Sequence, residues 1–161
     1  MMDVERIFCD TNILIYATDS TSPWHAHAVA ALRTTQDAGM LRVISTQVLR
    51  EFYAFATRTS SQGQNHDWER VRHAQRNIME FRASFQILDD TVLVSSQLFA
   101  LTDQIAVGGR QIHDANIVAT MLTNGVTHLL THNPDHFGRF ARMITVVPLT
   151  SFMADASERH S

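Results

Sequence analysis

Residues 6–16 read RIFCDTNILIY and decide the fold, because an apolar run stops there at an acid. Residues 6–9 are predicted to form a first strand, and Asp10, Thr11 and Asn12 follow it at once. In open parallel sheets the carboxyl end of a strand is where ligands bind, so an acid there is a candidate site residue. Taken alone, Asp10 would by default be interpreted as a turn or cap residue, since Asp and Asn side chains bond local backbone N–H groups.

Short apolar runs alternate with helical patterns along the rest of the chain. Further strands are expected at residues 42–45, 85–88, 128–131 and 144–147. Helices are expected after Pro23, after a cap at Thr46, and over about 67–83. Two more are expected from a capping region at 89–91 to about 107 and over 114–123, with a polar loop at 60–65. This alternation favours an α/β fold with a short, mostly parallel sheet flanked by helices on both faces. We expect a single domain over residues 1–150 and a polar C-terminal tail over residues 151–161.

Two more acids occupy positions from which a carboxylate can face a cleft. Glu51 lies on the expected helix from Thr46, beside an apolar stripe that includes Val48. A carboxylate at such a boundary is costly to bury unless a cation or hydrogen bonds balance it. Asp114 is expected to open its helix, where the helix dipole favours an acid and free N–H groups suit phosphate. Together with Asp10, these acids are the oxygen ligands that hard cations such as Mg²⁺ prefer.

Composition narrows the class of protein. The chain has 161 residues, is 45% hydrophobic and 18% charged, and carries a net charge of −3. It can therefore bury a core. Its negative net charge does not by itself attract nucleic acid, so any binding of nucleic acid must depend on a metal and local basic residues. The single cysteine, Cys9, rules out an internal disulfide and reads as a small core residue. No signal segment or membrane-length apolar run is seen, so we expect a cytoplasmic protein with no membrane partner.

Four motifs in order carry a resemblance to a known family. They are CDTNILIY (9–16), STQVLREF (45–52), IHDANIVA (112–119) and LLTHNPDHF (129–137). Together they resemble the four motifs of PIN-domain nucleases, over about residues 6–148. The chain's size, without extra domains, is most similar to the VapC-type toxins of bacterial toxin–antitoxin pairs.

The resemblance implies a set of site residues. Asp10, Glu51 and Asp114 would be the catalytic acids around Mg²⁺ or Mn²⁺. The family's fourth acid falls at Asn133, which keeps an oxygen acceptor but lacks the charge, so Asp135 is an alternative. Expected supporting or substrate-contacting residues are Thr11, Asn12, Arg110, His113, Asn116 and Thr131. Arg110 would suit a phosphate contact beside the cleft.

The implied function is a divalent-metal-dependent endoribonuclease, the toxin component of a type II toxin–antitoxin system. Its implied partners are an RNA substrate, a cognate antitoxin protein and a second copy in a homodimer. Two alternatives stay open: a degenerate PIN fold that binds RNA or protein without cleavage, and an RNA-processing nuclease that is not a toxin. The charge lost at Asn133 is the reason to keep the first.

Overall fold

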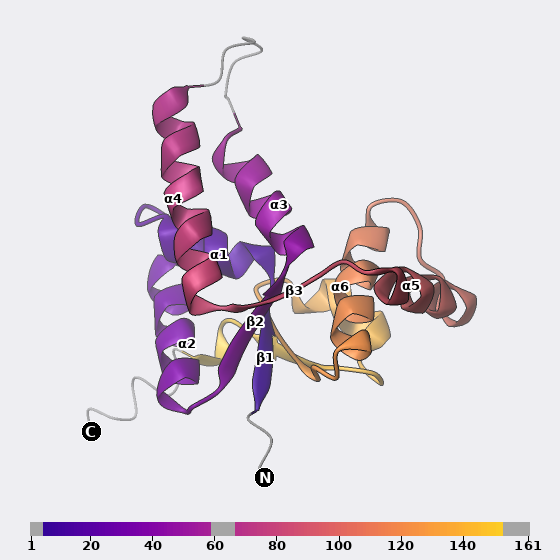
Figure 1. Ribbon diagram of the computed structural model, residues 1–161. Coiled ribbons are helices and arrows are strands. Elements are labelled where there is room, and N and C mark those ends of the chain that lie inside the picture. The colour runs from indigo at the N-terminus through magenta and orange to yellow at the C-terminus, as the bar shows by residue number, and fades with distance from the viewer. Residues whose placement is uncertain (1–4, 59–66, 153–161) are drawn as a thin grey trace, which may run out of the picture.

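The computed structural model describes residues 5–58 and 67–152, which form alternating strands and helices (Figure 1). In chain order these elements are β1 (Arg6–Cys9), α1 (Thr11–Thr18), α2 (His25–Asp37), β2 (Leu41–Ser45), α3 (Thr46–Ala56), α4 (Trp68–Ser84), β3 (Gln86–Leu88), α5 (Val92–Gln104), α6 (Gln111–Thr123), β4 (His128–Thr131), the 3₁₀ helix η1 (Pro134–Phe140) and β5 (Thr145–Pro148). The predicted α/β class is confirmed.

The five strands form one parallel sheet in the order β3-β2-β1-β4-β5. The chain runs outward from β1 to β3 through α1–α4, then returns past β1 to β4 through α5 and α6. The two sets of helices lie on opposite sides of the sheet (Figure 1). The strand order therefore reverses between β1 and β4, and such a reversal opens a crevice at the carboxyl ends of the two strands.

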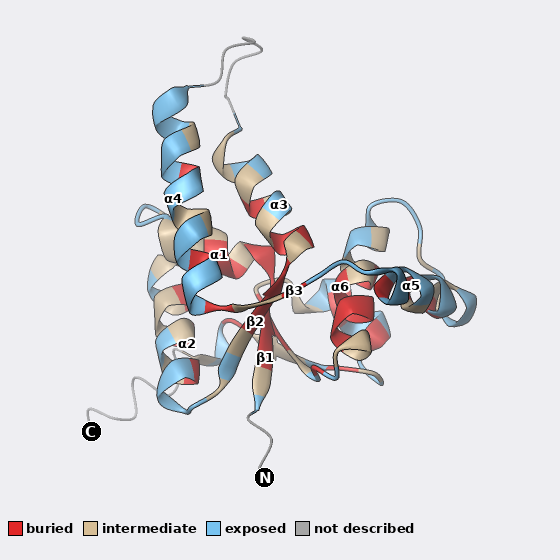
Figure 2. Cartoon of the chain, viewed as in Figure 1, coloured by how far each residue is buried: buried red, intermediate tan, exposed pale blue. Residues whose placement is uncertain are grey.

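The core lies on the central strands and the inner helix faces (Figure 2). Ile7, Phe8 and Cys9 of β1 are at most 2% exposed, as expected for a strand covered on both faces. On α6, the run Ala115–Met121 is buried apart from Asn116. Such burial stabilises by roughly 1.5–3 kcal/mol for each large apolar side chain. The central strand is thus anchored, and Asp10 follows it directly.

Several predicted boundaries shift. Ser45, and not Thr46, caps α3, because its side chain accepts from the Val48 N–H at 3.4 Å. The helix α5 ends at Gln104, three residues before the predicted end. The helix α6 begins at Gln111, so Asp114 lies within its first turn and does not open it.

The predicted loop at 60–65 and residues 153–161 of the predicted tail lie outside the described residues. The domain boundary at residue 150 stays a prediction, although Phe152 packs partly buried against the core. Within the described part of the chain, no helix combines the length and the apolar character needed to cross a membrane.

Candidate active site

Asp10 sits where the strand order reverses. Its backbone N–H donates to the Leu130 carbonyl at 3.0 Å, which ties the end of β1 to the end of β4. Its carboxylate caps α1 by accepting from the Thr11 N–H at 2.8 Å, and it also accepts from the Thr131 hydroxyl at 2.8 Å. Asn12 donates to the same carboxylate at 3.3 Å. Capping and site roles therefore coexist in Asp10, which is 8% exposed.

Glu51 lies near Asp10 and is carried by α3, the helix that follows β2. The helix α3 starts at the end of β2, beside β1, so Glu51 approaches the start of α1. The Thr11 hydroxyl donates to Glu51 Oε2 at 2.7 Å, and Gln47 Nε2 donates to Glu51 Oε1 at 2.7 Å. Both carboxylate oxygens are therefore held by donors from two different helices.

Asp114 comes from the opposite layer, on the first turn of α6. It is only half-buried, and its nearest basic neighbour is His136, whose Nδ1 lies 3.9 Å from Asp114 Oδ2. No donor holds its carboxylate within the described residues in the way that Thr131 and Thr11 hold Asp10. Asp114 is therefore the least constrained of the three acids.

The three acids act on one another electrostatically. The pKa of Asp10 is raised from 3.8 to about 6 as the net result of several effects. Burial is the largest and raises it, hydrogen bonds from Thr131 and Thr11 lower it, and the charges of Asp114 and Glu51 raise it. Burial also raises the pKa of Asp114, with His136 lowering it and Glu51 raising it. The two charges that act on Asp10, those of Asp114 and Glu51, are thus both negative, and no positive charge of the described residues balances them at Asp10.

The residues present fit a hard divalent cation by chemistry. Each of the three acids offers carboxylate oxygen, and Mg²⁺ is commonly held by one or two carboxylates while it keeps several waters. Among residues 5–58 and 67–152, no three His, Cys, Asp or Glu side chains lie close enough to form a metal-binding group. The geometry therefore fits an open site with few protein ligands better than a closed cage.

The side chains of the two candidates for the fourth ligand, Asn133 and Asp135, lie apart from the hydrogen bonds that hold the acids. The backbone N–H of Asn133 donates to the Thr131 hydroxyl at 3.1 Å, and Asp135 is exposed on η1. No hydrogen bond of the described residues joins the side chain of either residue to the three acids. The assignment of Asn133 or Asp135 to a metal stays a prediction.

The predicted supporting residues divide into three groups. Thr11, Asn12 and Thr131 contact the acids directly, as described above. Asn116 acts one step away, since its Nδ2 donates to Gln47 Oε1 at 2.7 Å. His113 and Arg110 are exposed at the start of α6, and Arg110 has no contact with the acids in the described part of the chain.

Two residues near the acids were not predicted. Gln47 is 5% exposed and bonds to Glu51 and to the His113 carbonyl. Its position four residues before Glu51, on one helix face, was the available signal. Arg139, whose charge lowers the pKa of Asp114, bonds to Gln111 Oε1 at 2.7 Å, and no local pattern marks it.

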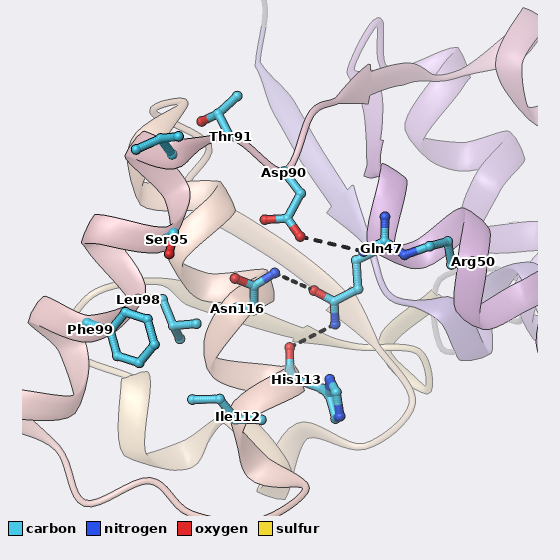
Figure 3. Close-up of a pocket in the computed structure, with 11 residues that line it drawn as sticks. Gln47, Arg50, Asp90, Thr91, Ser95, Leu98, Phe99, Ile112, His113 and Asn116 are labelled. Atoms are coloured by element: carbon cyan, nitrogen blue, oxygen red, sulfur yellow. Dashed lines mark hydrogen bonds and ion pairs between the residues drawn. The ribbon is translucent and has the colours of Figure 1, made fainter.

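A pocket of about 560 Å³ opens beside the acids, between α3 and the pair α5 and α6 (Figure 3). Gln47, His113 and Asn116 form its polar side, and Leu98, Phe99 and Ile112 are among its apolar residues. Arg50 and Asp90 form an ion pair at 3.5 Å across it. None of the three acids lines the pocket, and Gln47, which donates to Glu51, connects it to them.

The fold and the site define an α/β protein with a buried carboxylate, Asp10, at the switch point of a parallel sheet and two further carboxylates whose charges act on it. The PIN domain family matches residues 7–143, and the chain belongs to this family. No curated protein sequence matches the chain.

Solved structures agree on the fold. VapBC2 from Rickettsia felis, bound to a DNA fragment from its promoter, is 16% identical, with a TM-score of 0.64 over 89% of this chain and 98% of that one. A toxin–antitoxin complex from Klebsiella pneumoniae is 23% identical, with a TM-score of 0.61 over 89% and 97%. VapC20 from Mycobacterium tuberculosis, a sarcin-ricin loop cleaving toxin, is 15% identical, with a TM-score of 0.56 over 76% and 86%.

Proposed function

We propose that this chain is a divalent-metal-dependent endoribonuclease and the toxin component of a type II toxin–antitoxin system. The observation that carries the proposal is Asp10, a buried acid at the switch point of a PIN domain, acted on by two further acids and by no cation in the described part of the chain. Such a charge arrangement is unfavourable by itself and favourable around a metal ion.

Asp10, Glu51 and Asp114 would hold the ion, Mg²⁺ or Mn²⁺. When bound, the ion supplies an activated water and stabilises charge on the phosphate. Thr131 and Thr11 keep the Asp10 carboxylate pointed into the site, and Thr11 and Gln47 do the same for Glu51. Without an ion, the three negative charges would repel an RNA phosphate, so substrate binding and metal binding are coupled.

A non-cleaving function is the second candidate. The uncharged Asn133 and the lack of a three-acid group in the described ranges both favour a PIN fold that binds RNA or a protein without cutting it. A nuclease of RNA processing, which is not a toxin, would share the site and differ only in its partners.

The expected protein partners are an antitoxin and a second copy of this chain. The similar structure from Klebsiella pneumoniae is a toxin–antitoxin complex by its description, which supports an antitoxin here. Exposed apolar side chains on α4 and α5 support protein contacts; they are Trp68, Met79, Val92, Leu93 and Phe99. Since its substrate would be cellular RNA, the expected location is the cytoplasm.

The test is cleavage of a panel of structured RNAs with Mg²⁺, with Mn²⁺ and with a chelator, by the wild type and by Asp10→Asn. Asp103→Asn, an exposed acid on α5, is the matched control. Metal-dependent cleavage by the wild type and the control, but not by Asp10→Asn, supports the enzyme. RNA binding without cleavage under every condition supports the non-cleaving alternative. A small DNA-binding protein encoded next to this chain, and able to block cleavage, would separate a toxin from a processing nuclease.

A further inference from the structure

Gln47 is a buried polar residue that joins the two layers of the site. Its Nε2 donates to Glu51 Oε1 at 2.7 Å and to the His113 carbonyl at 3.0 Å. Its Oε1 accepts from Asn116 Nδ2 at 2.7 Å. Figure 3 shows Gln47 between α3 and α6, with dashed lines to Asn116 and to the His113 carbonyl.

The orientation of this amide is determined by its neighbours. A glutamine side chain offers two N–H donors on one atom and an acceptor on the other. If the amide flipped, its oxygen would face the Glu51 carboxylate and the His113 carbonyl, and its NH₂ would face the NH₂ of Asn116. Every contact would then pair two acceptors or two donors, so the Gln47 NH₂ group must face Glu51.

Gln47 is linked to all three acids through a few hydrogen bonds. Glu51 Oε2 is held by the Thr11 hydroxyl, and the Thr11 N–H binds Asp10. The His113 carbonyl belongs to the residue before Asp114, so Gln47 also holds the turn that carries Asp114. Removing Gln47 would release one Glu51 oxygen and loosen that turn in a single step.

We propose that Gln47 is a positioning residue, which sets the Glu51 carboxylate and the first turn of α6 for binding a divalent ion. The inference rests on the proposed function, because it concerns the same metal site. A carboxylate at this position would add a negative charge against Glu51 and against the His113 carbonyl. An apolar residue would leave the Asn116 donor and the His113 carbonyl without this partner. Only a neutral donor–acceptor of this length makes all three contacts.

The main variant is Gln47→Met, which keeps the length and the apolar stem but cannot donate. Loss of a partner that orients a metal ligand typically costs 10–100-fold in metal affinity or activity. We expect the Mn²⁺ Kd measured by calorimetry to rise by about tenfold or more and the metal concentration for half-maximal cleavage to rise in parallel. The KM for RNA, measured at saturating metal, should change little. Asn116→Ala removes only the contact that orients the amide and should raise the Mn²⁺ Kd by about threefold, the value of one weak hydrogen bond.

Two controls separate positioning from general damage. Thr35→Val removes a buried hydroxyl of α2, which bonds only within its own helix, and should leave the Mn²⁺ Kd unchanged. In a Glu51→Gln background, Gln47→Met should cost less Mn²⁺ affinity than it costs in the wild type, since the Glu51 ligand is already altered and, of the two contacts made by the Gln47 NH₂ group, only that with the His113 carbonyl is left to lose.

The outcomes are distinguishable. If the wild type neither binds Mn²⁺ nor cleaves RNA, the proposed function fails. If the wild type does both, and Gln47→Met and Asn116→Ala keep its Mn²⁺ Kd, the positioning role is overturned while the function stands. Equal further loss from Gln47→Met in the wild type and in Glu51→Gln would also overturn it. If Gln47→Met does not fold, the Kd of Asn116→Ala decides.

Discussion

The two halves of the candidate site differ in how firmly they are held. At the β1–β4 edge, Asp10 is buried and its carboxylate accepts from Thr11, Asn12 and Thr131. On the α6–η1 side, Asp114 is half-buried beside the exposed His136, and among the described residues no hydrogen bond joins the side chain of Asn133 or Asp135 to the acids. One half is thus preorganised, and the other is free to adjust when an ion or a phosphate arrives.

The largest expected effect is on cleavage. Asp10→Asn and Asp114→Asn should each reduce metal-dependent RNA cleavage by more than about 100-fold, since losing a ligand exceeds the loss of a ligand's support. Circular dichroism should show an unchanged fold. If the preorganised half dominates, Asp10→Asn should be the more damaging. Full activity in either folded variant would defeat the assignment of that acid, and Asp103→Asn should behave as the wild type.

The buried carboxylate of Asp10 should make the stability of the metal-free protein depend on pH. The pKa of Asp10 is raised from 3.8 to about 6, so between these pH values the folded state holds a proton that the unfolded state releases. Stability should therefore fall as pH rises from about 4 to about 6 and stay low above that. The full penalty is roughly 3 kcal/mol.

Asp10→Asn tests this sign, because it removes the charge. At pH 8 the metal-free variant should be more stable than the wild type by about 1–2 kcal/mol, as the amide loses one acceptor oxygen. The difference should shrink toward pH 4. Urea unfolding with a chelator, at several pH values, measures it; a difference independent of pH would contradict the electrostatic cause.

Binding of a divalent ion should offset the stability that the metal-free protein loses when Asp10 is ionised. Mg²⁺ or Mn²⁺ at about 100 times its Kd should stabilise the wild type by about 2.7 kcal/mol, seen as a rise in Tm. The rise should be smaller in Asp10→Asn and unchanged in Asp103→Asn. No rise in the wild type at tens of millimolar metal would count against a preformed site.

The smallest effects on metal affinity are expected from changes at Asn133 and Asp135. If Asn133 faces the ion, Asn133→Asp should raise divalent affinity, by about tenfold at most, and sustain cleavage at low metal. If Asp135 supplies the fourth acid, Asp135→Ala should lower the affinity and Asn133→Asp should add only repulsion. Calorimetric titration of both variants separates the two arrangements. No change in either would leave Asp10, Glu51 and Asp114 as the whole acid set.

The sequence by itself determined the features that depend on local patterns. The apolar run of β1 ending at Asp10, the helix carrying Glu51 and the cap of α5 at Thr91 follow from periodicity and side-chain capping within a few residues. The family motifs then predicted the acids and their order. The errors at Ser45 and Asp114 are also local, because neighbouring polar residues compete for a helix start.

Tertiary structure alone decided which of these residues meet. Thr131 donates to Asp10 across 121 positions of sequence, and Asn116 donates to Gln47 across 69. Both contacts exist because the sheet places β1 between β2 and β4, which brings three strand ends and α6 to one edge. Such pairing is set by burial of the whole core and not by any local signal, so Gln47 became visible as part of the site only in the folded chain.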